Sequence, residues 1–173
     1  GNLLALAARE VHDNTLLFLD WPPLVKPRAT KMEGLTVISD RKGDEIGKGY
    51  QLMDVVAAEP DNDLMMPLAR SLWTADSDTA FETNSLSLVS RVRAATANRG
   101  IIIADRSGDH PALISAWTGD PTCRYIVRLR LHTELLYRRQ IRTVGEIAAT
   151  CRTPYGRNAP NIGSDGRTRA VFV

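Results

Sequence analysis

Two short apolar runs in the sequence end in an aspartate. Residues 16–19 are followed by Asp20, and residues 101–104 are followed by Asp105 and Arg106. Short runs rich in β-branched and aromatic residues are typical of buried strands. In open α/β sheets, ligands bind outside the carboxyl ends of the strands, where side chains reach solvent from a rigid support. We therefore predict that both aspartates are functional, with an aspartate that merely begins a turn as the alternative for each.

Paired carboxylates at strand ends favour metal-dependent chemistry at phosphorus. Mg²⁺ prefers oxygen ligands and keeps several waters, so one or two carboxylates together with substrate phosphates are enough to hold it. Two such ions can clamp the attacking and leaving oxygens of an in-line displacement. Without a cation, two adjacent carboxylates repel one another and the pKa of one of them rises. This hypothesis requires the two strand ends to be neighbours.

The rest of the sequence predicts the elements that would position the two aspartates. Apolar periodicity and turn residues indicate a short leading helix at 2–12, a strand at 15–19, a hairpin of strands 35–39 and 49–58, a helix at 64–73, an amphipathic helix from Asn84 or Ser85 to Arg99, a strand at 101–104, a helix at 110–117 and a strand at 123–131. This order predicts an α/β fold with a ribonuclease-H-like mixed sheet flanked by helices. Its first three strands would form an antiparallel meander and the later ones would be parallel. Crossover handedness would place the fourth strand beside the first.

Positive charge is concentrated late in the chain. The net charge is only +2, but eight arginines lie between Arg124 and Arg157, with Glu134 and Glu146 as the acids of that stretch. Such an asymmetry favours a surface that binds a polyanion, although a solvated basic surface explains any single arginine. Cys123 and Cys151 lack metal-ligand spacing, so both are predicted to be reduced. No apolar run reaches the roughly 18 residues of a membrane span, and no signal pattern precedes the first helix, which predicts an intracellular protein.

In their order and intervals, these segments resemble the catalytic core of the DDE transposases of bacterial insertion sequences, of the insertion-sequence-four type. The resemblance covers most of residues 15–131 and rests on five pieces: Leu17-Phe18-Leu19-Asp20-Trp21, residues 49–57, Glu82-Thr83-Asn84-Ser85, Ile102-Ile103-Ala104-Asp105-Arg106 and residues 124–128. In that family the first aspartate ends the first strand, and the second ends the fourth strand in an Asp-Arg dipeptide. The resemblance thus implies that Asp20 and Asp105 are catalytic residues and metal ligands.

The family's activity implies the cofactor and the partners. A transposase of this kind uses Mg²⁺ or Mn²⁺ to cleave DNA and to transfer strands at transposon ends. The resemblance implies that it acts on double-stranded DNA, forms a homodimer when complete, and works in the bacterial cytoplasm in association with the nucleoid, with no membrane partner. Phosphate contacts need positive charge but carry no sequence code. We predict that these contacts come from Arg106, Arg128, Arg130, Arg138, Arg139 and Arg142.

The chain departs from the family's pattern at the third catalytic acid. That acid follows a mostly β insertion, and Glu134 and Glu146 come too soon after the last predicted strand to match it. We therefore expect an incomplete ribonuclease-H-like catalytic core at 1–131, followed at 132–173 by the beginning of a β-rich insertion. The loop Trp21-Pro22-Pro23 also replaces the Thr or Ser pair that the family often has after its first aspartate.

Two alternatives remain open at this point. One is a catalytically incomplete remnant that only binds DNA, and the other is a ribonuclease-H-like nuclease whose site is completed by Asp54 or Glu134. Asp54 is better explained as an acid on the exposed face of the sheet. His12 and His110 have no ligand partner at metal spacing, so both are expected to be surface or capping residues. Arg106 is expected to contact either DNA phosphate or Asp109, which is itself expected to be structural.

Overall fold

The computed structural model describes residues 2–29, 31–39, 45–61, 64–74, 80–151, 158–162 and 168–172. The chain divides into two compact units, Gly1–Leu129 and Arg130–Val173. The roles expected for the two parts, a catalytic core and the beginning of an insertion, stay predictions. None of the helices in the described ranges is long and apolar enough to cross a membrane.

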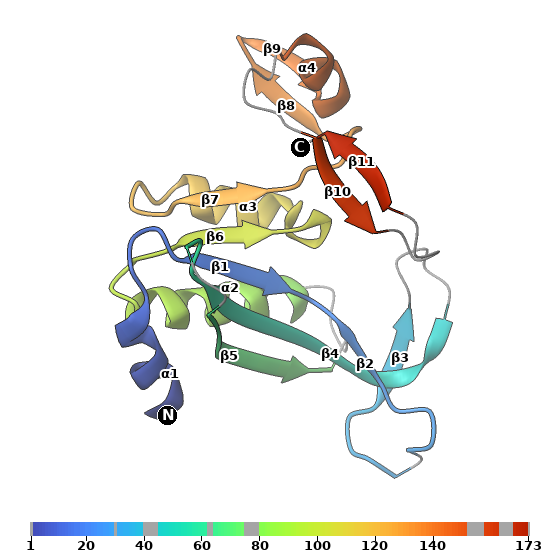
Figure 1. Ribbon diagram of the computed structural model, residues 1–173. Helices are drawn as coiled ribbons and strands as arrows, with labels where there is room; N and C mark the ends of the chain where they lie inside the picture. The colour runs from blue at the N-terminus through green and yellow to red at the C-terminus, as the bar shows by residue number, and fades with distance from the viewer. Residues whose placement is uncertain are drawn as a thin grey trace. The chain divides into compact units, whose positions relative to one another are not determined.

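The first unit is built around a seven-stranded mixed sheet (Figure 1). Its elements are α1 (Asn2–Ala7), a 3₁₀ turn (Ala8–Glu10), β1 (Leu16–Asp20), β2 (Pro23–Val25), β3 (Thr36–Ser39), β4 (Glu45–Ala58), β5 (Met65–Trp73), α2 (Ala80–Ala95), β6 (Ile101–Ala104), a 3₁₀ turn (Arg106–Gly108), α3 (Pro111–Thr118) and β7 (Tyr125–Val127). The last strand is shorter than the predicted 123–131.

The strand order across the sheet is β5-β4-β1-β6-β7. Strand β4 is antiparallel to both β1 and β5, whereas β1, β6 and β7 are parallel to one another. Three antiparallel strands followed by parallel ones, with helices packed against the sheet, confirm the predicted ribonuclease-H-like fold class. The predicted pairing of the fourth strand with the first is also confirmed, as β6 with β1.

The helix predicted at 64–73 is wrong, because this segment forms strand β5. Its leucines recur every four residues, a spacing that suits one face of a helix and equally suits the two-residue period of a strand. Pro67 disfavours a helix interior but is tolerated in a strand at a bulge. It pairs with Val56 beside the register shift between Val55 and Val56, and the extra residue there is Leu68.

The predicted meander is wrong in which strands pair with one another. Strand β3 pairs with β4 as the expected hairpin, but β1 also pairs with β4 and not with β3. The 14-residue strand β4 has β1 and β2 along one edge and β3 and β5 along the other. Because β4 is long enough to pair with two strands along each edge, β3 pairs with the same edge of β4 as β5 does. It does not lie between β1 and β4.

The hydrophobic core lies between one face of the sheet and the helices. Alternation along β1 turns Leu17 and Leu19 into this core and leaves Phe18 and Asp20 on the other face. Helices α2 and α3 contribute to the same core, which comprises mainly Val11, Met53, Val55, Ala57, Leu68, Leu88, Val89, Val92, Ile102, Ala104, Leu113 and Trp117. Helix α2 begins at Ala80, before the predicted start at Asn84 or Ser85, so Ser85 is a fully buried residue of its interior.

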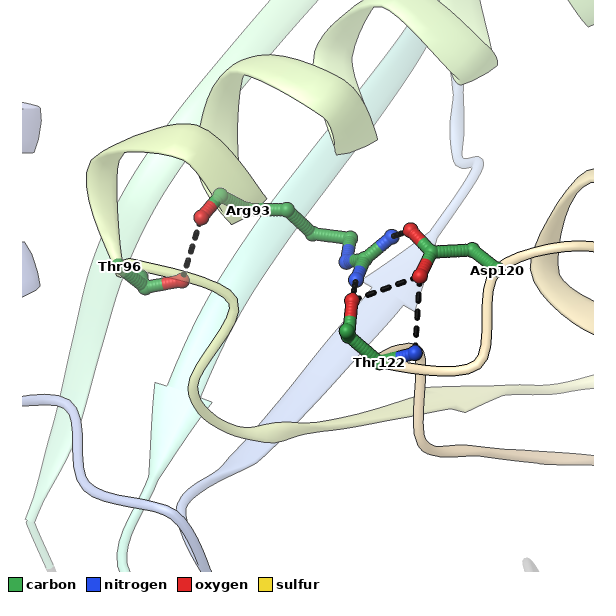
Figure 2. A network of polar contacts seen from close by, with 4 residues as sticks. All are labelled: Arg93, Thr96, Asp120 and Thr122. Atoms are coloured by element: carbon green, nitrogen blue, oxygen red, sulfur yellow. Dashed lines mark hydrogen bonds and ion pairs between the residues drawn. The ribbon is translucent and has the colours of Figure 1, made fainter.

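A polar network joins α2 to the segment before β7 (Figure 2). Arg93 of α2 donates to Asp120 Oδ2 at 2.6 Å and to Thr122 Oγ1 at 2.8 Å. Asp120 Oδ1 accepts from the backbone amide and the hydroxyl of Thr122 at 2.8 and 2.6 Å. The hydrogen bond from Arg93, followed by those from Thr122, lowers the pKa of Asp120 to about 2. The network therefore fixes the approach of the chain to β7, the strand beside β6.

The second unit contains two hairpins and a short helix. Its elements are β8 (Glu134–Tyr137), β9 (Gln140–Thr143), α4 (Val144–Thr150), β10 (Asn158–Ile162) and β11 (Thr168–Phe172). Thr143 and Glu146 form a capping box at the start of α4, so Glu146 is engaged in helix capping. The β8–β9 turn has Arg138 at φ 50° and Arg139 at φ 66°. A left-handed conformation costs roughly 1–2 kcal/mol for a residue with a Cβ, so this turn is strained.

Gly100 permits the entry into β6, which gives a first prediction. Its φ is +93°, and a Cβ would lie 2.8 Å from Cγ and Cδ1 of the buried Leu17. We expect Gly100→Ala to lower the free energy of unfolding by about 1–3 kcal/mol, because it combines backbone strain with a clash in the core. Urea denaturation measures this change. Gly119→Ala is the control, since Gly119 has an ordinary φ of −70°; equal effects at the two positions would contradict the argument.

The Arg93–Asp120 pair gives a prediction for acid stability. Because the pKa of Asp120 is lowered in the folded state from 3.8 to about 2, its carboxylate stabilises the fold above about pH 4, and this contribution is lost as the pH falls towards 2. We expect the urea midpoint of the wild type to fall more steeply over this interval than that of Asp120→Asn. The control is Asp13→Asn, which removes an exposed acid. Parallel pH profiles for the wild type and Asp120→Asn would contradict the assignment.

Candidate functional site at the ends of strands β1 and β6

Parallel pairing brings Asp20 and Asp105 to neighbouring strand ends. Leu19 of β1 is the register partner of Ala104 of β6, and the next residue on each strand is the aspartate. Paired strands lie about 4.8 Å apart, so the two backbones are adjacent where the aspartates leave them. The sheet thus brings together the two residues that the sequence singles out, although their catalytic and metal-binding roles stay predictions.

Each carboxylate is oriented by a nearby backbone amide. Asp20 Oδ1 accepts from Trp21 N at 2.9 Å, and Asp105 Oδ1 accepts from Ser107 N at 2.8 Å. The second bond caps the 3₁₀ turn that follows β6. Asp20 is exposed and Asp105 is half-buried. These local bonds restrict the rotation of both side chains, which favours a defined arrangement of their oxygens.

A third aspartate occupies the same row of the sheet. Asp54 of β4 is the antiparallel register partner of Asp20, so both side chains lie on the sheet face opposite the core. Across β4, Arg70 is the partner of Asp54 and donates to Oδ1 at 2.5 Å and to Oδ2 at 2.8 Å. The hydrogen bond with Asp54 raises the pKa of Arg70. Asp54 therefore lies close to the pair in register, with both of its oxygens bound by a guanidinium.

An aromatic cluster connects the start of α2 to the segments that follow β1 and β6. Trp21 Nε1 donates to Ser85 Oγ at 2.9 Å, and the ring centroid of Phe81 lies 5.7 Å from that of Trp21 and 5.6 Å from that of His110. Next to Phe81, Glu82 Oε1 lies 3.3 Å from His110 Nε2. Sequence reasoning missed this cluster, because its members come from three distant segments and share no spacing.

His110 and Asp109 also have defined places. His110 precedes α3 at the capping position, but its side chain makes no cap hydrogen bond and contacts Glu82. The predicted capping role of the His110 side chain is therefore wrong. Asp109 is 7% exposed, a burial that agrees with the structural role expected for it. His12 is exposed, and its backbone amide donates to Thr15 Oγ1.

The predicted DNA-binding arginines fall into two groups. Arg106 is exposed and directly follows Asp105, and the amide of the exposed Arg128 donates to Ala104 O at 3.0 Å, one residue before Asp105. Both therefore lie beside the end of β6. The second group is exposed and belongs to the second unit: Arg130, Arg138, Arg139 and Arg142. Glu134 is in that unit too, at the start of β8.

The donor set fits a hard divalent cation in part. Carboxylate oxygens at adjacent strand ends are the ligands that Mg²⁺ and Mn²⁺ accept, with water and phosphate oxygens filling the remaining positions. Within the described ranges, however, no group of three or more His, Cys, Asp or Glu side chains is arranged to hold a metal ion. A cation bound by Asp20 and Asp105 would therefore depend on further ligands.

Comparisons with known proteins add a general structural similarity. No family model matches the chain, and no curated protein matches it. Among solved structures, a crystal structure of the Mos1 strand transfer complex is similar over 75% of this chain, with 15% sequence identity and a TM-score of 0.34. The matched part spans 38% of that other chain, well under half of its length. A similarity at this level carries no conclusion about function.

Proposed function

We propose that the first unit is the catalytic core of a DDE transposase of the insertion-sequence-four type. With a third acid completing its site, it would perform metal-dependent cleavage and strand transfer at transposon ends. The observation that carries this proposal is the parallel register of β1 and β6, since it brings Asp20 and Asp105 to adjacent strand ends. The resemblance in sequence singles out the same two residues.

The site residues have distinct proposed roles. Asp20 and Asp105 would hold Mg²⁺ or Mn²⁺ through their carboxylates, oriented by the amides of Trp21 and Ser107. A bound divalent cation would neutralise phosphate charge and activate the attacking hydroxyl for an in-line displacement. Arg70 neutralises Asp54 in the same row, so the carboxylate pair has one fewer uncompensated negative charge beside it when a phosphate approaches.

The partner that fits these residues is double-stranded DNA. Arg106 and Arg128 flank the end of β6, where they would contact the phosphates of the strand being cut. Arg130, Arg138, Arg139 and Arg142, which belong to the second unit, would also contact the duplex. A homodimer acting on two transposon ends, in a bacterial cytoplasm near the nucleoid, completes the proposal.

A second candidate function is a ribonuclease-H-like nuclease with a complete site in the first unit. The observation that favours it is Glu82, an acid in the first turn of α2 whose carboxylate contacts His110, five residues after Asp105. Phe81 beside it packs against Trp21, which directly follows Asp20. Glu82 would be the third carboxylate of this nuclease site. Of the two acids considered from the sequence, Asp54 is the other option in the first unit, whereas Glu134 belongs to the second unit.

Isothermal titration with Mn²⁺ tests both functions. We expect the wild type to bind Mn²⁺ and Asp20→Asn and Asp105→Asn to bind it at least about tenfold more weakly, a loss of about 1.4 kcal/mol. Asp13→Asn, which changes an exposed acid before β1, is the matched control and should bind as the wild type does. Thermal unfolding of each variant checks that the fold is retained.

Two further results separate the candidate functions. If Glu82→Gln also loses Mn²⁺ affinity, the nuclease is favoured, whereas an unchanged affinity favours the transposase with its third acid elsewhere. Metal binding that is the same in the wild type and Asp105→Asn would refute both. In that case, duplex binding that needs no metal and falls steeply with salt would indicate the DNA-binding remnant.

A further inference from the structure

The turn of the β8–β9 hairpin contains two consecutive arginines in the left-handed conformation. Arg138 and Arg139 connect Tyr137 and Gln140, which are register partners, so the turn has two residues. Two-residue hairpin turns with positive φ at both positions strongly favour Asn-Gly. The chain instead accepts backbone strain at both positions. Backbone strain of this kind is concentrated at functional sites, where a side chain is retained for its function and not for stability.

Two of the arginines at the turn end of the hairpin contact neighbouring side chains. The guanidinium carbon of Arg138 lies 5.1 Å from the ring centroid of Tyr137, within the range of a cation–π contact. Arg142 donates to Gln140 Oε1 through Nη2 at 2.7 Å and through Nε at 3.2 Å. Between residues 134 and 143 these three arginines accompany a single acid, Glu134, which lies at the far end of β8. The tip is therefore strongly cationic.

The same hairpin exposes a pair of large apolar side chains. Leu136 and Ile141 are register partners, which places them side by side on one face, and they are 78% and 72% exposed. This pair is next to the Tyr137–Gln140 pair, which closes the turn. Exposed apolar side chains grouped beside positive charge are typical of an interaction surface. Because the adjoining cations attract a polyanion, charge complementarity favours nucleic acid over an apolar protein partner.

We propose that the β8–β9 hairpin enters the major groove of duplex DNA, with the two turn arginines on guanine edges and the Leu136–Ile141 pair against thymine methyl groups. A two-stranded ribbon has strands about 4.8 Å apart, which suits a groove about 12 Å wide and not one about 6 Å wide. Guanine O6 and N7 are the usual major-groove partners of arginine, and the thymine methyl is the apolar group in that groove. This inference rests on the proposed DNA partner and specifies how it is read.

Three double variants of the full chain test the hairpin. Arg138→Asn with Arg139→Gly removes both charges and relieves the strain, Leu136→Thr with Ile141→Thr removes the apolar pair, and Arg9→Asn with Arg91→Asn removes two exposed charges from the first unit as a control. The probe is a 30-base-pair duplex of random sequence, partially methylated with dimethyl sulfate. We expect the wild type to exclude N7-methylguanine from the bound fraction, and the turn variant to lose this selection with at least about tenfold weaker binding.

The turn variant is also expected to unfold at a higher urea concentration than the wild type, since Asn-Gly suits the turn. Weaker DNA binding in a more stable protein cannot come from misfolding. Replacing thymine by uracil in the probe should weaken binding by the wild type about threefold or more and leave the Leu136→Thr, Ile141→Thr variant unaffected. The charge control should retain the exclusion of N7-methylguanine even if its overall affinity falls.

Several results would overturn the proposal. Exclusion of N3-methyladenine in place of N7-methylguanine would put the hairpin in the minor groove, and equal binding by the wild type and the turn variant would remove it from the interface. A dimer in sedimentation that dissociates in the Leu136→Thr, Ile141→Thr variant would assign the apolar pair to a second copy of the chain. Because these assays measure duplex binding in EDTA, without a divalent cation, a failure of the hairpin is distinguishable from a failure of the metal site, which the Mn²⁺ titration tests.

Discussion

The parallel pairing of β1 with β6 is the constraint on which the candidate site depends. These strands are separated by most of the first unit, and their register makes Leu19 the partner of Ala104. Since side chains alternate between faces, the same register places the buried residues of both strands in one core. The next residue of each strand then lies at the carboxyl end of the strand. A slip by one residue would turn the core residues outward, so core packing itself fixes where the two aspartates stand.

Electrostatics give the sheet its second constraint. Arg70, Asp54 and Asp20 lie in register across β5, β4 and β1, and Asp105 follows directly after the neighbouring β6. In a row of three acids without compensation, each carboxylate would repel the next. Arg70 engages both oxygens of Asp54, which concentrates the uncompensated negative charge at the ends of β1 and β6. Farther along the chain, the Arg93–Asp120 network supports β7 by the same kind of pairing.

The sequence was sufficient for the features that local pattern and topology rules govern. The runs ending in Asp20 and Asp105 are apolar and short, and crossover handedness makes their strands neighbours. The pattern misled at β5, where leucines every four residues suit either a helix or a strand and only pairing with β4 decides. The contacts of Glu82 with His110 and of Trp21 with Ser85 could not be predicted, because they depend on how α2 packs against the sheet and not on spacing along the chain.

The bulge in the β4–β5 pairing determines which side of the sheet Arg70 occupies. Leu68 is the extra residue between the pairs Val56–Pro67 and Val55–Ala69, and beyond it Arg70 faces Asp54. If Leu68 were instead paired with Val55 in a regular ladder, Arg70 would stand opposite Met53, whose side chain is fully buried. A guanidinium would then enter the core while Asp54 lost its partner. The unpaired residue at the bulge thus protects the core and the charge balance of the sheet at once, because it places Arg70 in the row of Asp54 and Asp20.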